Sequence, residues 1–130
     1  MNKTFCLLNH ELTQNQVLEL QEKYKAESIV YPPEQLSKKW SQIAATKELD
    51  KSLICDVIEW LAGAKSGDFL IVQGEFGTTF MIVDYALKKN LVPLHAVTKR
   101  VAKEQRNGEV VSRQYIFEHV CFRKYEYYKI

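Results

Sequence analysis

The sequence predicts an α/β protein with a Rossmann-like, mostly parallel sheet, helices on both faces and a C-terminal β-hairpin. Short apolar runs alternate with stretches of helical periodicity along most of the chain. These runs are continuously apolar, which is typical of parallel strands that are covered on both faces. Near the C-terminus, two long runs of mixed polar and apolar residues flank Asn107 and Gly108, a pair that favours a type I′ hairpin turn.

Length and composition indicate one globular domain over residues 1–130. The chain is 46% hydrophobic and 26% charged, as is usual for a protein with an ordinary core. Its three cysteines, Cys6, Cys55 and Cys121, are odd in number and widely spaced, which favours reduced thiols in a cytoplasmic protein. We see no signal peptide and no apolar stretch of the ~20 residues that a membrane span needs, and therefore expect no membrane partner.

Four apolar runs before the hairpin are predicted strands: residues 4–8, 28–31, 69–72 and 91–97. Helices are predicted to begin at Thr13, at Asp50 and at about Thr79, and the second of these is predicted to end at Gly63 as its C′ residue. Thr13 and Gln16 have the spacing of a capping box. Residues 34–47 are expected to be irregular or to form a short helix. The fully apolar run 69–72 predicts a central strand.

Three segments are expected at the carboxyl ends of the strands, where open parallel sheets bind ligands. Asn9 and His10 follow the first strand, residues 73–79 follow the third, and residues 98–100 follow the fourth. The amide of Asn9 can orient a base or a ribose, and a histidine suits general acid–base work because it titrates near neutral pH. A purely structural role for His10 remains open.

The segment from Gln73 to Thr79 has the composition of an anion-binding turn. Gly74 and Gly77 allow the backbone to turn and a ligand to approach, and Thr78 and Thr79 place hydroxyl groups at a helix N-terminus. The segment is neither a P-loop nor a dinucleotide fingerprint, since the lysine of the first and the glycine spacing of the second are absent. A strand, turn and helix with no ligand is the alternative.

Basic residues near the hairpin could contact phosphates. Lys99 and Arg100 are predicted to lie just past a strand end, with Arg123 reaching the same ligand. Taken alone, Lys99 and Arg100 are better explained as a solvated charge pair, and the glycine segment shifts the balance toward an anion site. The aromatic and basic residues 117–128 favour a dimer interface over single-stranded nucleic acid. A net charge of +2 argues against a protein that coats long nucleic acid. No set of residues has metal-ligand spacing, so neither a metal nor another cofactor is expected.

Five segments in one order resemble a small CRISPR-associated family, the Csx group numbered twenty. They are Leu-Leu-Asn-His-Glu-Leu-Thr, Ile-Val-Tyr-Pro-Pro-Glu, Trp-Ser-Gln-Ile, Val-Gln-Gly-Glu-Phe-Gly-Thr-Thr and His-Val-Cys-Phe-Arg-Lys-Tyr, and they cover nearly the whole chain. The resemblance implies a CARF-like fold, a homodimer and a ring nuclease of type III CRISPR defence. Such a protein opens a cyclic oligoadenylate messenger, here cyclic tetra-adenylate, and ends its signal.

The expected reaction is metal-independent, because RNA carries its own nucleophile in the 2′-hydroxyl group. The expected catalytic residues are His10, Thr79 and Arg100. The expected ligand-binding residues are Asn9, Gln73, Gly74, Phe76, Gly77, Thr78, Thr98, Lys99 and Arg123. A sensor that binds the ring without cutting it needs the same pocket and remains the main alternative. A protein-interaction domain with an empty glycine turn is a third possibility.

Overall fold

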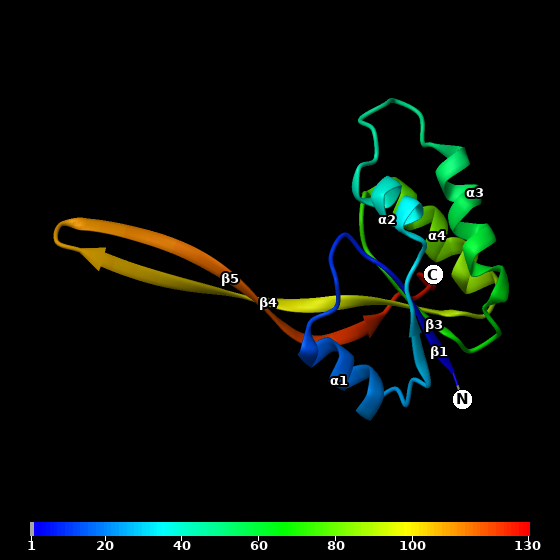
Figure 1. Cartoon of the computed structure of the whole chain (residues 1–130), viewed down its shortest axis with the longest axis horizontal. Coiled ribbons are helices and arrows are strands. Elements are labelled where there is room, and N and C mark those ends of the chain that lie inside the picture. Colours follow the sequence, from blue (N-terminus) through cyan, green and yellow to red (C-terminus); the bar gives the residue numbers. More distant parts are fainter. Residues whose placement is uncertain (1) are drawn as a thin grey trace.

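The computed structural model describes residues 2–130 and is a mixed α/β fold with a five-stranded sheet (Figure 1). The strands are β1 (Lys3–Leu7), β2 (Ser28–Val30), β3 (Phe69–Val72), β4 (Val92–Asn107) and β5 (Val110–Lys124). The helices are α1 (Gln14–Glu22), α2 (Glu34–Ser41), α3 (Lys51–Trp60) and α4 (Phe76–Lys88), and a 3₁₀ turn, η1 (Leu61–Gly63), follows α3. The predicted short helix after the second strand is therefore α2.

The strand order of the sheet is β2-β1-β3-β4-β5, with β3 in the centre as predicted. β1 pairs in parallel with β2 and β3, and β3 pairs in parallel with β4. Each parallel pairing has only three or four residue pairs, whereas the antiparallel β4–β5 pairing has fourteen. The sheet is thus mixed. Three of its four strand pairings are parallel, but most of the paired residues belong to the antiparallel pairing, so the expected mostly parallel sheet is not confirmed.

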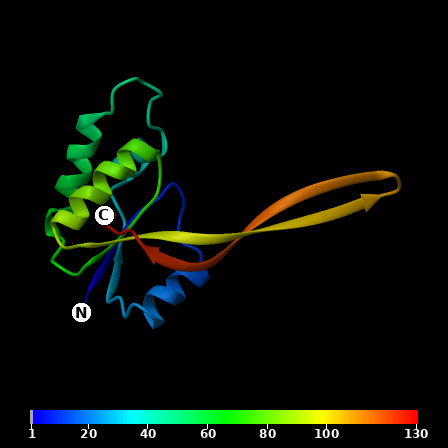
Figure 2. The same cartoon turned by 180° about the vertical axis from the view of Figure 1, so that it is seen from behind.

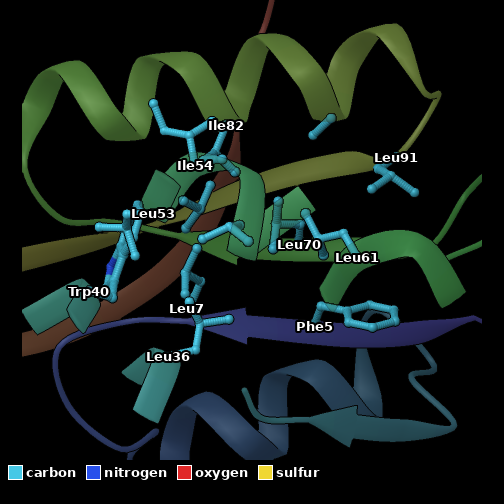
Figure 3. Close-up of a cluster of buried hydrophobic side chains, with 13 residues drawn as sticks. Phe5, Leu7, Leu36, Trp40, Leu53, Ile54, Leu61, Leu70, Ile82 and Leu91 are labelled. Carbon is cyan, nitrogen blue, oxygen red and sulfur yellow. The ribbon is translucent and has the colours of Figure 1, made fainter. Parts of the chain in front are cut away.

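Helices cover both faces of the sheet, as the continuous apolar runs predicted. Successive strand residues point to opposite faces, so Leu7 and Leu70 enter one core while Cys6 and Ile71 enter the other. The first core is closed by α2, α3 and α4, and Figure 3 shows its side chains converging between these helices and the sheet. The second core is closed by α1 through Leu20.

Two predicted helix starts are confirmed, and one predicted helix end is wrong. The Thr13 side chain accepts a hydrogen bond from the Gln16 N–H, and the Gln16 side chain accepts one from the Thr13 N–H, which completes the capping box. Asp50 caps α3 by accepting a hydrogen bond from the Leu53 N–H. Gly63 is not the C′ residue of α3, because the chain continues from α3 directly into η1, which ends at Gly63. The φ of Gly63 is also not positive, as a left-handed C′ residue requires.

β4 and β5 continue past the sheet as a two-stranded hairpin, which we call the arm (residues 98–118) (Figures 1 and 2). The last residue of β3 that pairs with β4 is Ile71, opposite Leu94, so within residues 2–130 the outer part of β4 has β5 as its only strand neighbour. At the tip, Gly108 alone has a positive φ, of 67°. The turn residues are therefore Gly108 and Glu109 with a type II′ pattern, one position later than predicted and not type I′.

Candidate functional site

Two pockets open at the edge of the sheet where the parallel strands end. The larger, of about 590 Å³, lies between the segment after β1 and α2, and we call it the β1–α2 pocket. The smaller, of about 340 Å³, lies beside the start of α4, and we call it the α4 pocket. Both lie where ligands bind in open α/β sheets, at the carboxyl ends of the strands.

The structure distributes the predicted site residues over three places. Asn9 and His10 line the β1–α2 pocket together with Tyr31 and Lys38. Gln73, Gly74, Phe76 and Thr79 line the α4 pocket. The residues Thr98, Lys99 and Arg100 lie at the base of the arm, and Arg123 pairs with His95 on the adjoining strand. The prediction that residues 98–100 follow a strand end is wrong, because β4 continues through them, although they do lie beyond the end of β3.

His10 is exposed at the rim of the β1–α2 pocket. Its Nδ1 lies 2.9 Å from the carbonyl oxygen of Glu11. A carbonyl oxygen can only accept, so Nδ1 carries the hydrogen and donates it, which leaves Nε2 as the acceptor nitrogen. The side chain is thus oriented by its own neighbour and keeps one nitrogen available for a proton.

The N-terminus of α4, predicted as an anion site, already holds the carboxylate of Glu75. Oε1 of Glu75 accepts a hydrogen bond of 3.0 Å from the Gly77 N–H, and Oε2 accepts one of 2.9 Å from the Thr78 N–H. The hydrogen bond from the Thr78 backbone is the main reason why the pKa of Glu75 is lowered from its usual range. A phosphate would have to displace this carboxylate to use the same N–H groups.

We expect the substitution Glu75→Gln to weaken the acid dependence of stability. The pKa of Glu75 is lower in the folded chain than in the unfolded chain. The stability that the Glu75 carboxylate contributes is therefore complete above the unfolded pKa and is lost as the pH falls through the folded pKa. Melting temperatures measured between pH 7 and pH 3 would show the variant below the native protein at neutral pH, with the difference narrowing in acid. Glu126→Gln, in the C-terminal tail, serves as the control. A difference that stays constant with pH would contradict this role.

Gly74 and Gln73 have structural partners inside the chain. A Cβ atom on Gly74 would lie 2.8 Å from the Trp40 ring, so packing against Trp40 by itself requires glycine at this position. The Trp40 Nε1–H donates to the Gln73 carbonyl oxygen at 2.9 Å. The Gln73 side chain accepts a hydrogen bond of 2.8 Å from the Ala96 N–H and so connects β3 to β4.

The two threonines of α4 point inward. Thr78 is 1% exposed and Thr79 is 9% exposed. Oγ1 of Thr79 is buried and has no hydrogen-bond partner among the described residues. A hydroxyl in this position cannot touch a ligand unless the start of α4 moves, so the structure offers no direct catalytic contact for Thr79.

At the base of the arm, the Arg100 guanidinium lies 3.7 Å from the centroid of the Tyr115 ring, in a cation–π arrangement. Lys99 stands opposite Glu118 across the hairpin. These contacts leave both cations at the surface, where phosphate oxygens can reach them.

His95, Tyr125 and Arg123 form a polar group between the arm and the α4 pocket. The centroids of the His95 and Tyr125 rings lie 4.7 Å apart. The Tyr125 hydroxyl donates a hydrogen bond of 2.8 Å to the Val72 carbonyl oxygen. Burial, and then the charge of Arg123, lower the pKa of His95, which therefore favours the neutral form. Only the sheet register brings these residues together, so no local sequence signal could have found the group.

Comparison with known proteins places the chain in a family. A family model described as "Uncharacterized protein MJ1673 family" matches residues 2–123. The chain belongs to the MJ1673 family. The protein MJ1673 of Methanocaldococcus jannaschii is 34% identical over 130 residues, which cover 98% of this chain and 100% of that protein. No solved structure matches the chain.

Two further observations concern metals and membranes. Within residues 2–130, no group of three or more His, Cys, Asp or Glu side chains is placed so that it could hold a metal ion. In the same part of the chain, every helix is too short or too polar to cross a membrane.

Proposed function

We propose that this chain binds a cyclic oligoadenylate at the carboxyl edge of its sheet and opens the ring, as a cytoplasmic ring nuclease of CARF-like, Rossmann-like fold. The observation that supports this best is the open β1–α2 pocket, in which Asn9 and His10 are exposed side by side. The order β2-β1-β3-β4, with helices on both faces, is that of flavodoxin-like sheets, whose ligands bind near the ends of β1 and β3. The sequence resemblance to the Csx family supplies the identity of the ligand.

The proposed reaction needs a base, an oriented 2′-oxygen and stabilisation of the phosphorane. Nε2 of His10 would take the proton of the 2′-hydroxyl, whose oxygen attacks the adjacent phosphorus. The bond from phosphorus to the 5′-oxygen breaks, and the product ends in a 2′,3′-cyclic phosphate and a 5′-hydroxyl. Lys99, Arg100 and Arg123 would offset the growing negative charge. A cyclic tetranucleotide has approximate twofold symmetry, which suits a site shared by two copies of the chain.

The second candidate, a sensor that binds the ring without cutting it, is favoured by the surroundings of α4. The carboxylate of Glu75 occupies the helix N–H groups, and the hydroxyl of Thr79 is buried. The N–H groups of the predicted anion site are therefore engaged, and the hydroxyl of one expected catalytic residue is inaccessible. The engaged carboxylate and the buried hydroxyl are compatible with binding of the ring and argue only against its cleavage.

The test incubates the protein with cyclic tri-, tetra- and hexa-adenylate, measures binding by calorimetry and separates the products by chromatography. We expect the tetra-adenylate to be bound and cut, and its 2′-deoxy analogue to be bound but left intact. His10→Ala should lower the cleavage rate by about 10²–10⁴-fold with little change in affinity. Lys99→Ala, which removes one proposed phosphate contact, should weaken binding. Lys129→Ala, in the C-terminal tail, is its control for the loss of one surface cation.

Three results would contradict all or part of the proposed function. Cleavage of the 2′-deoxy ring would refute attack by the 2′-hydroxyl. A ring that binds but stays intact at stoichiometric protein would establish the sensor. A chain that binds none of the three rings would overturn the proposal as a whole.

A further inference from the structure

The arm is the most unusual surface of the molecule, because almost nothing in the chain covers it. All its residues are exposed except Val101, which is half-buried (Figures 1 and 2). An isolated two-stranded hairpin is at best marginally stable in water, so a hairpin of this length is expected to gain stability from a further surface. The question is which surface covers it.

The arm also carries the net charge of the chain. It holds five of the 18 Lys and Arg residues and three of the 16 Asp and Glu residues, so its charge is +2. The remainder of the chain, with 13 residues of each sign, is neutral.

One face of the arm combines aromatic rings with arginines. Residues paired directly across the hairpin share a face, and successive residues alternate between faces. The register therefore places on one face Phe117 with Arg100, Tyr115 with Ala102, Arg113 with Glu104, and Val111 with Arg106. Phe117 is 67% exposed and Tyr115 is 47% exposed. Aromatic residues and arginine are the types enriched in the cores of protein–protein interfaces.

The start of α4 has matching properties. Phe76 and Phe80 are one helical turn apart, 93% and 72% exposed, and they form the rim of the apolar α4 pocket with Val83 and Tyr125. The exposed carboxylate of Glu75 stands at the same end of the helix. The chain thus presents exposed rings and positive charge on the arm, and an apolar pocket beside a negative charge on its body.

We propose that two copies of this chain exchange arms, each laying the Phe117 face of its arm along α4 of the other, with the Phe117 ring in the α4 pocket. The arm leaves the body beyond the end of β3 (Figure 1), at the edge where both pockets open. A twofold axis at that edge would direct each arm onto the other body. Because the chain carries both complementary surfaces, the contact is made twice and the assembly closes as a dimer.

The available area agrees with a weak dimer that forms as the protein concentration rises. Ten residues per strand give an arm about 34 Å long, and two strands give it a face about 10 Å wide. α4 has 13 residues and spans about 20 Å, so each arm–α4 contact buries about 200 Å² on either side and two contacts bury about 800 Å², the size of a weak, concentration-dependent interface. This inference deepens the proposed function by naming the surface that joins two copies, and it does not depend on the ligand.

The test measures the molar mass in solution, by light scattering and by sedimentation, over a range of protein concentrations. We expect a dimer for the native chain, and at least a tenfold weaker dimer for Phe117→Ser on the arm and for Phe80→Ser on α4. Both side chains are exposed, so neither change should affect the fold, which circular dichroism would verify. Leu18→Ser, at an exposed apolar residue of α1 on the other face of the sheet, is the matched control.

Mixing the two variants gives the sharper result. A Phe80→Ser chain keeps its arm and a Phe117→Ser chain keeps its pocket, so the mixture should form a heterodimer with one intact contact at concentrations where each variant alone is monomeric. A monomeric native chain, or a mixture that stays monomeric where the native chain dimerises, would overturn the proposal. The proposal would also be overturned if the native chain were a monomer that binds single-stranded RNA and if Phe117→Ser abolished that binding. A dimer that binds no cyclic oligoadenylate would refute only the proposed function.

Discussion

Replacing Trp40 by alanine is expected to lower the free energy of unfolding by about 3–5 kcal/mol, as is usual for the loss of a large buried aromatic side chain. Trp40 is 1% exposed and belongs to the core between α2, α3, α4 and the sheet (Figure 3). Its ring fills the space left by Gly74, and its indole N–H donates to the Gln73 carbonyl oxygen. The substitution therefore leaves a cavity and an unpaired carbonyl directly below the two pockets. Urea unfolding followed by circular dichroism gives the value.

The other tryptophan provides the matched control. Trp60 is only partly buried and packs edge-on against Phe5, so Trp60→Ala should cost clearly less. Trp40→Phe should fall between native protein and Trp40→Ala, because it keeps most of the apolar contacts and loses the indole N–H. Equal costs for the two alanine variants would show that Trp40 does not organise this end of the core.

Replacing Glu19 by alanine is expected to cost about 2–6 kcal/mol, because its loss leaves two buried hydrogen-bond donors unsatisfied at about 1–3 kcal/mol each. The side chains of Glu19 and His119 are only 8% and 7% exposed. The Glu19 carboxylate accepts a hydrogen bond of 2.7 Å from His119 Nε2 and one of 2.8 Å from the Phe122 N–H. Its loss leaves both donors buried without a partner, at the point where α1 holds β5 below the arm.

Thermal and urea unfolding measure this cost, and amide hydrogen exchange shows where the structure loosens. We expect Glu19→Ala to speed exchange at Phe122 more than in the first core. Glu22→Ala, three residues later on α1 and exposed, is the control and should change stability by less than about 0.5 kcal/mol. A Glu19→Ala chain as stable as the Glu22→Ala chain would mean that the pair does not anchor the arm.

Local patterns predicted most of the elements but only part of the site. The Thr13–Gln16 capping box is complete within four residues, so its sequence spacing was sufficient to locate α1. The Glu75 cap was missed, and α4 begins at Phe76, three residues before the predicted start, because glutamate is not a usual N-cap residue. The packing of Gly74 against Trp40 was not predicted, since the two residues are 34 positions apart in the sequence and only the folded chain brings them together.

The sequence by itself determined the strands, the two-sided covering of the sheet and the hairpin, because each depends on residues that are neighbours along the chain. Continuous apolar runs require cover on both faces, and Gly108 at the tip provides the positive φ of the turn. Only the tertiary structure decided where the parallel sheet ends and the arm begins. That boundary depends on the length of β3, which stops at Val72 while β4 continues to Asn107, and strand neighbours across a sheet leave no trace in local sequence.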